Sequence, residues 1–551
     1  MSMKSVMSHQ FSQIPRVNIP RSVFNRSHGY KTTFDSGYLV PFYVDEALPG
    51  DTFNLQATLF ARLATPIVPV MDNMFLDTFF FAVPIRLIWN NWQKFNGEQE
   101  NPGDSVDYLV PQVTAPSNGW PVGSISDYMG IPIGVEVPVS ALWHRAYNLI
   151  YNEWFRDENL QDSVDVPKGD GPDSASTYKL LRRGKRHDYF TSCLPWPQKG
   201  PGIELPLGDA APVVGNGMTL GLTDTINSFG LSTSRVGTIS TSGGSTRALA
   251  PIKNTYGTLA GASVIGSYSS DVPSENEGYV GLGVTAEIGK SGLMADLSSA
   301  TAATLNSLRQ AFQLQRLLEK DARGGTRYTE IIRSHFGVIS PDARLQRPEY
   351  LGGSSTRIMI NPVQQTSSTD STSPQGNLAA FGIASDSFHG FNKSFTEHCV
   401  IIGLLNVRAD LTYQDGLNRM FSRRTRWDYY WPSLAHLGEQ AVLNKEIYCQ
   451  GTVADDDVFG YQERWAEYRY MPSKITGFLR SKASQSLDVW HLSQNFENLP
   501  VLNDEFIEEN PPVKRMIAVQ NQPEFILDSY ISLKCARPMP VYSVPGLIDH
   551  F

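Results

Sequence analysis

The chain has 551 residues, of which 41% are hydrophobic and 18% charged, and its formal net charge is −9. This balance excludes a protein that binds nucleic acid over its whole surface, because phosphate binding needs clustered Lys and Arg. The charged fraction lies below the usual value of about a quarter, so much of the surface is neutral or apolar and suits burial against other subunits. A monomer with a surface rich in Ser, Thr and Asn is the alternative.

The four cysteines lie far apart and form no C-x-x-C pair, which indicates free thiols in a reducing compartment. The N-terminus lacks the apolar core of a secretory signal. The most apolar stretches are interrupted or shorter than the roughly 20 residues that span a bilayer. These features predict a soluble protein made in the cytoplasm.

The first 34 residues differ from the rest in charge. They contain no acid, since the first is Asp35, and Pro15 and Pro20 discourage a helix. We expect an extended basic arm, and the lack of acids favours contact with nucleic acid over contact with other subunits. The candidate DNA-facing residues are Lys4, Arg16, Arg21, Arg26 and Lys31.

Alternation of apolar and polar residues predicts the first strands. Between 53 and 63, Phe53, Leu55 and Ala57 share one parity with the other apolar residues, and polar residues hold the opposite parity. This pattern is typical of a strand with one buried face. The aromatic-rich segment 75–83 predicts a second strand.

A helix and a basic cluster follow. At 140–155, Leu142, Ala146 and Ile150 recur at helical spacing and predict an amphipathic helix. The segment LLRRGKRHDYF then gathers cations that suit single-stranded DNA or a subunit interface equally well. These second-tier candidates are Arg182, Arg183, Lys185 and Arg186.

Residues 200–300 have a different composition, with 18 of the 45 glycines and many Ser and Thr. Apolar residues still recur, so we expect short strands and turns in a surface insertion, not a disordered linker. A second amphipathic helix is predicted at 304–320, and a polar loop at 366–374.

Alternation returns at 399–413 and 525–535. In the first of these strands apolar residues hold the odd positions, and Arg408, Asp410 and Thr412 are expected to face the other way. The segment FSRRTRWDYYW between the two strands places arginines beside Trp and Tyr, which suits single-stranded DNA or a subunit interface equally. Its second-tier candidates are Arg423, Arg424 and Arg426.

Strands at both ends of the chain predict one mainly β sandwich that the N- and C-terminal parts close together. The intervening chain would then be inserted, and two independent β-domains are the alternative. Motifs for metalloproteases, α/β-hydrolases and dinucleotide binding are absent from the sequence, so we expect no catalytic residue, no metal and no cofactor. A carbohydrate-binding β-sandwich or glycosidase and a single-stranded-DNA-binding protein are the competing classes.

Four blocks, at 18–53, 185–201, 327–353 and 463–480, resemble gokushovirus major capsid proteins, within the microviruses. The first reads NIPRSVFNRSHGYKTTFDSGYLVPFYVDEALPGDTF and the last ERWAEYRYMPSKITGFLR. The resemblance implies an eight-stranded antiparallel jelly roll with long loops. It also implies a small icosahedral shell of identical copies, with T=1 symmetry, around a circular single-stranded DNA genome.

The same resemblance implies partners and a division of the chain. Residues 200–300 match, in position and character, an insertion that forms protrusions at the threefold axes, where a receptor on a bacterial host would bind. A small basic DNA-binding protein would be packaged inside. We expect a virion protein, assembled in the bacterial cytoplasm, that is divided into an arm at 1–34, the first part of the jelly roll at 35–199, the insertion at 200–300 and the rest of the jelly roll at 301–551.

Overall fold

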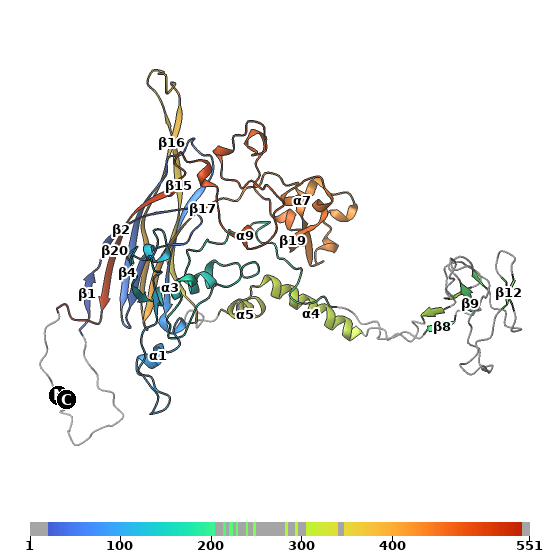
Figure 1. The fold of residues 1–551 in the computed structure, drawn as a ribbon, viewed down its shortest axis with the longest axis horizontal. Coiled ribbons are helices and arrows are strands. Elements are labelled where there is room, and N and C mark those ends of the chain that lie inside the picture. Colours follow the sequence, from blue (N-terminus) through green and yellow to red (C-terminus); the bar gives the residue numbers. More distant parts are fainter. Residues whose placement is uncertain are drawn as a thin grey trace. The chain divides into compact units, whose positions relative to one another are not determined.

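The computed structural model describes residues 20–203, 305–339 and 346–542, and between 213 and 295 it describes only the backbone of short strands (Figure 1). The chain divides into two compact units, one of residues 1–200 with 318–551 and the other of residues 201–317. Among the described residues, no helix combines the length and apolar character needed to cross a membrane.

The first unit is built on a sandwich of eight antiparallel strands. One half has the strand order β2–β20–β4–β16, and the short strand β1 pairs with the far end of β20. The other half has the order β3–β17–β5–β15. The strands are β1 (Ser22–Asn25), β2 (His28–Phe34), β3 (Val40–Ala47), β4 (Thr52–Leu63), β5 (Met74–Pro84), β15 (Glu349–Gln364), β16 (Leu378–Ser394), β17 (Cys399–Ala409) and β20 (Phe525–Arg537).

A single long hairpin joins the two halves. β15 pairs with β5 through Ile358, and β16 pairs with β4 from Ile383 onward. Between these points β15 and β16 pair with each other. This strand order is that of a jelly roll, so the expected eight-stranded fold is confirmed. The alternative of two independent β-domains is wrong, because N-terminal β2 and β4 both pair with C-terminal β20.

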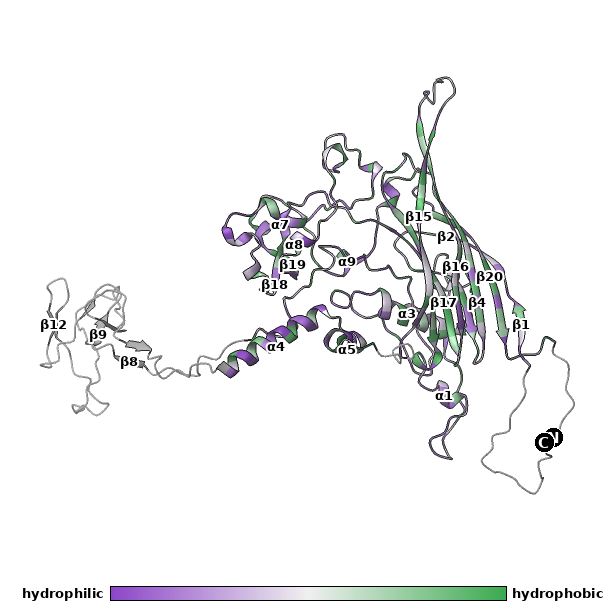
Figure 2. Cartoon of the chain, turned by 180° about the vertical axis from the view of Figure 1, so that it is seen from behind, coloured by the Kyte–Doolittle hydropathy of each residue, from purple (hydrophilic) through white to green (hydrophobic). Residues whose placement is uncertain are grey.

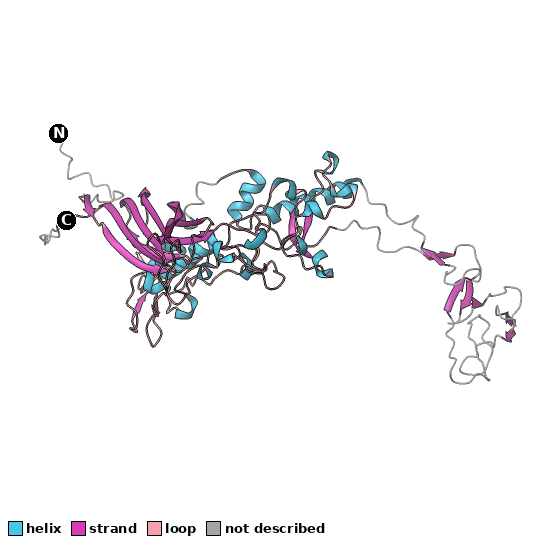
Figure 3. Cartoon of the chain, turned by 90° about the horizontal axis from the view of Figure 1, so that it is seen from above, coloured by secondary structure: helices cyan, strands magenta, loops and turns pink. Residues whose placement is uncertain are grey.

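The main core lies between the two halves. It contains every second residue of β4, as the alternation in 53–63 predicts, together with the inward residues of β20 and β17. Aromatic rings meet across the sandwich, with Phe80 of β5 and Phe391 of β16 at 5.6 Å between centroids. Figure 3 shows the strands lying together, with helices to one side of them.

A helical layer covers the other face of the half that contains β17. Helix α3 (Leu142–Ile150) presses Leu142, Ala146 and Ile150 into a second core with the outward residues of β5 and β17. Arg408 lies on the face of β17 opposite to Ile401 and Leu405, as the alternation in 399–413 predicts. The helical layer covers that face as well, so all eleven residues of β17 are buried.

A smaller lateral region packs around a third apolar cluster, which includes Phe190, Val442 and Phe459. Helix α4 (Leu305–Arg323) matches the helix predicted at 304–320. Figure 2 shows polar and apolar residues interleaved along it. The shorter elements are α1 (Trp92–Phe95), α2 (Ile125–Tyr128), β6 (Gln112–Thr114), β7 (Pro138–Ser140), α4 (Leu305–Arg323), α5 (Tyr328–Phe336), β18 (Glu439–Leu443), α7 (Asn444–Ile447), β19 (Val458–Glu463), α8 (Ala466–Arg469) and α9 (Asp504–Ile507).

The second unit contains short antiparallel strands, as predicted for 200–300, although most residues of that segment lie outside the described part. β8 pairs with β14, β9 lies between β10 and β13, and β11 pairs with β12. The bounds are β8 (Val213–Gly215), β9 (Leu220–Thr223), β10 (Ser228–Phe229), β11 (Thr238–Ser240), β12 (Thr246–Ala248), β13 (Gly281–Val284) and β14 (Leu293–Ala295).

The buried His144 of α3 makes a prediction about acid stability. Burial lowers its pKa to about 4, although a backbone hydrogen bond at Ser140 and the charge of Asp173 act in the opposite direction. Its ring stacks on Trp120, contacts Tyr178 and lies 2.8 Å from the Ser126 hydroxyl. Between pH 6.5 and 4 the unfolded chain therefore takes up a proton that the folded chain does not. The free energy of unfolding should fall by about 3 kcal/mol over this window.

Urea unfolding of the wild type and His144→Gln at several pH values measures this effect. The variant keeps a neutral polar side chain, so its free energy of unfolding should depend less on pH between 6.5 and 4. Identical pH profiles for the two proteins would show that His144 does not cause the loss.

Candidate nucleic-acid and subunit interfaces

The structure places three of the five basic residues of the N-terminal segment, while Lys4 and Arg16 lie outside the described residues. From Ser22 onward the segment forms β1 and β2. Arg21 donates a hydrogen bond to the Thr52 hydroxyl at 2.5 Å. Arg26 pairs with Asp45 at 2.7 Å, and Lys31 pairs with Asp528 at 2.6 Å. The described cations therefore lie on or beside the sandwich and have partners within the chain.

The half-sandwich β2–β20–β4–β16 has one buried face and one exposed face, which we call the outer sheet face. On it, Asp528 of β20 lies between Lys31 of β2 and Phe60 of β4. Two residues along β20, Ile526 lies opposite Arg62 of β4. Phe60 and Tyr530 are 48% and 55% exposed. The exposed charged residues on these four strands are Lys31, Arg62, Lys534 and Asp528, so cations outnumber acids.

A bulge in β16 adds a third aromatic ring near this face. The register with β4 shifts between Asp386 and His389, so that Phe388 lies opposite the region of Thr58. Phe388 has a φ of +63° and is 76% exposed. A non-glycine residue rarely adopts this left-handed conformation, and strain of this kind is concentrated at functional positions. Nothing in the sequence pattern predicted the bulge.

The basic cluster at 182–186 is mostly engaged inside the subunit. Arg182 lies over the Tyr38 ring at 4.1 Å and donates to the Glu509 carbonyl at 3.0 Å. Lys185 is buried and donates to the Gln494 side chain at 2.9 Å, and burial lowers its pKa to about 8. Arg186 alone of the four is exposed.

Arg183 belongs to a buried ion-pair network that the sequence analysis missed. The Asp77 carboxylate of β5 accepts from Arg183 at 2.7 Å and from Arg408 of β17 at 2.9 Å. The Ser355 hydroxyl of β15 also donates to it, at 2.6 Å. The sequence contained one indication of this network, which is the acid within the aromatic run FLDTFFFAV. A carboxylate buried in such a strand needs a partner.

The arginines at 423–426 belong to a surface of exposed rings. Arg423 lies 4.2 Å from the Tyr468 ring centre and pairs with Glu467 at 3.4 Å. Arg426 lies over the Trp431 ring at 4.6 Å. The sequence did not predict the second contributing segment, at 465–471. We call this group the aromatic surface, and its exposed rings are Phe421, Trp427, Tyr429, Tyr430, Trp431, Tyr468 and Tyr470.

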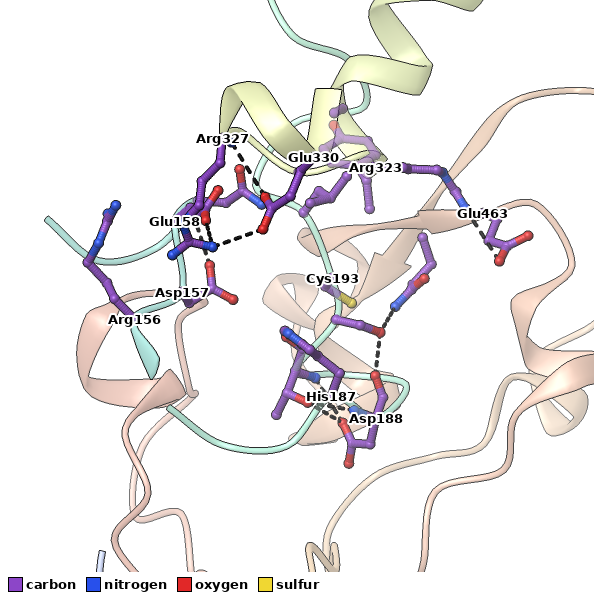
Figure 4. Close-up of a pocket in the computed structure, with 18 of the residues that line it drawn as sticks. Arg156, Asp157, Glu158, His187, Asp188, Cys193, Arg323, Arg327, Glu330 and Glu463 are labelled. Carbon is purple, nitrogen blue, oxygen red and sulfur yellow. Dashed lines mark hydrogen bonds and ion pairs between the residues drawn. The ribbon is translucent and has the colours of Figure 1, made fainter. Parts of the chain in front are cut away.

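A polar pocket of about 650 Å³ lies beside α5 and β19 (Figure 4). Arg327 pairs there with Glu158, with Glu153 at 3.2 Å and with Glu330 at 3.0 Å, and Arg323 pairs with Glu463 at 3.4 Å. Arginines thus neutralise most of the carboxylates that line the pocket.

The cysteine that lines the pocket, Cys193, is not activated as a nucleophile. Burial raises the pKa of the Cys193 thiol far above neutrality, so it stays protonated and unreactive. In the described part of the chain, no three His, Cys, Asp or Glu side chains come together in a way that could hold a metal ion. The geometry therefore directs attention to the surfaces.

Comparison with known proteins gives matches along nearly the whole chain. The family described as "Capsid protein (F protein)" matches residues 12–547. The capsid protein VP1 of Bdellovibrio phage phiMH2K is 50% identical over 553 residues, and that of Chlamydia phage 1 is 48% identical over 600 residues, each match covering 98% of both chains. The capsid protein VP1 of Spiroplasma virus 4 is 37% identical over 571 residues, with 99% of both chains covered.

Proposed function

The chain belongs to the capsid protein (F protein) family of the microviruses, and we propose that identical copies of it close into a small icosahedral shell around a circular single-stranded DNA genome. As a member of this family it is a structural component of the virion and not an enzyme. The observation that carries the proposal is the match along residues 12–547, which includes the whole described sandwich.

The aromatic surface supports contacts between copies. Phe421 and Trp427 are 68% and 62% exposed, an exposure that is unfavourable for such large rings in a lone subunit. Arg423 pairs with Glu467, and Arg426 lies over the rings of Trp427 and Trp431. Of the three arginines, Arg424 is therefore the one that could bind a phosphate. Aromatic rings and arginines are characteristic of the centres of protein interfaces. This surface therefore suits a neighbouring subunit better than DNA.

The outer sheet face supports contact with the genome. Exposed rings such as Phe60 and Tyr530 are surfaces on which bases stack, and Arg62 and Lys534 supply positive charge beside them. Arg21 and Lys31 bring the N-terminal segment to the same four strands. We therefore assign the outer sheet face and the basic residues at the N-terminus to the inside of the shell.

The charge balance suggests a second internal component. Each chain carries a net charge of −9 and cannot neutralise a genome by itself, because each bound phosphate needs a cation. A small basic DNA-binding protein inside the shell would share this task. The basic residues of the N-terminal segment 1–34, which contains no acid, would supply the coat protein's share of the positive charge.

The insertion at 200–300 is the candidate for contact with a receptor on the bacterial host. Its richness in glycine and short polar residues is typical of loops, and loops carry recognition on many scaffolds. Attachment through this segment and its placement at threefold axes are parts of the proposal that rest on composition and position in the chain.

Shell formation predicts how substitutions on the aromatic surface act. The expressed wild-type chain should form closed particles, or units on the way to them, in sedimentation and electron microscopy. Trp427→Ser should raise the protein concentration needed for assembly by about ten-fold, because the centre of an interface loses a large ring. Val453→Ser removes an apolar side chain that is 90% exposed on a different segment, and it is the matched control. A wild-type chain that stays monomeric at all concentrations would contradict the shell.

Genome contact predicts a change in salt dependence. Arg62→Gln with Lys534→Gln should weaken binding of single-stranded oligonucleotides by coat particles, because two phosphate contacts are lost. The slope of log K against log salt should decrease by roughly 1.4. Lys474→Gln, at an exposed lysine outside the outer sheet face, should leave the slope unchanged. In virions, charge reversal at Arg16 and Arg21 should yield empty shells, and unchanged packaging would argue against the internal role.

The attachment role predicts the behaviour of a deletion. Removing about residues 210–290 should give particles that assemble but adsorb poorly to host cells, since the sandwich strands all lie outside this range. Adsorption measured with purified particles tests this, and normal adsorption by smooth particles would assign attachment to another surface.

A further inference from the structure

The hairpin of residues 359–383, formed by the ends of β15 and β16, extends beyond the sandwich (Figures 1 and 2). β15 loses its pairing with β5 after Ile358, and β16 pairs with β4 only from Ile383. Within the described structure, both outer edges of the hairpin therefore lack a neighbouring strand. A hairpin of two strands has little stability alone in water, and natural proteins cover or charge such edges.

This hairpin is almost uncharged. Its 25 residues include one charged side chain, Asp370 near the tip, in a chain with 18% charged residues. The usual protection of an exposed edge by lysine is missing. The absence of Lys and Arg also argues against single-stranded DNA as its partner, because DNA binding depends on cations.

Apolar residues lie on both faces of the hairpin, and the large ones on one of these faces are exposed. Register pairs Met359 with Ile383 and Val363 with Ala379, and between them Phe381 faces Asn361. Paired residues and residues two positions apart share a face. Met359, Val363 and Phe381 are 64%, 47% and 37% exposed. These three residues share one face with Ala379 and Ile383, and we call it the hairpin face.

We propose that the hairpin face packs against a second copy of the chain and links neighbouring subunits in the shell. The inference rests on the proposed shell. A closed shell presents the same neighbour to every copy in one orientation, so a projecting hairpin meets a partner of fixed shape. Met and Phe are enriched at such contacts, whereas charged residues are depleted. Specific interfaces bury about 800 Å² per partner, so the hairpin face is one part of a larger contact.

Charge introduced at two places on the hairpin tests the proposal. Phe381→Asp places a carboxylate on the hairpin face, and Ser368→Asp places the same group in the exposed tip loop as a matched control. Met359→Ser is a milder change at a residue that is already 64% exposed, so it should fold as the wild type does. Sedimentation velocity over a range of concentrations measures assembly, and thermal unfolding of the unassembled subunits checks the fold.

We expect Phe381→Asp and Met359→Ser to raise the concentration needed for assembly by about ten-fold or more. Ser368→Asp should assemble as the wild type does. If the wild type assembles and both hairpin-face variants do so equally well, the hairpin inference is wrong while the shell proposal stands. Particles of Phe381→Asp that form normally but fail to adsorb to cells would identify a host contact and also overturn the inference. A wild type that never associates would count against the shell itself.

Discussion

The burial of β17 on both faces is the constraint on which the rest of the structure depends. A strand whose eleven residues are all buried needs an apolar layer on each side. The half-sandwich with β4 and β20 covers one side, and the helical layer around α3 covers the other. The subunit is thus three layers deep at β17. Because β4 and β20 are covered on one side only, their other face stays exposed, and the genome-facing role proposed for the outer sheet face follows from this order of layers.

Several charged residues pair with one another inside the subunit. Asp77 holds Arg183 and Arg408 and so ties β5 and β17 to the segment before the lateral region, and Arg423 is held by Glu467. Buried ion pairs add little net stability, but the loss of one partner is costly, so such networks fix geometry. The hairpin face carries no charged side chain, and the aromatic surface presents exposed rings beside its arginines. Assembly through apolar contacts of this kind should depend weakly on salt, whereas genome binding should depend on it strongly.

The connections explain how one sandwich carries so much additional chain. β5 and β15 are neighbours in the sheet but are separated by more than 250 residues, which include the helical layer and the second unit. Chain can be inserted there because the ends of the connection are already held together by strand pairing, and loop closure costs rise only slowly with length. In contrast, β15 and β16 follow each other directly in the chain. The parts of them that extend past β5 and β4 form the projecting hairpin.

Local patterns in the sequence located several regular elements. Alternation located β4 and β20, because each of these strands buries one face. Helical spacing located α3 and α4, although α3 is buried nearly all round and Phe312 of α4 is 65% exposed. The blocks of family resemblance implied the jelly roll. Only the tertiary structure decided that Arg408 is buried, that Arg183 and Lys185 point inward, and that Phe60, Tyr530 and Phe388 belong to neighbouring strands of one surface. These facts depend on partners hundreds of residues away in the chain, and the spacing of neighbouring residues contains no information about which distant strand will cover or complete a face.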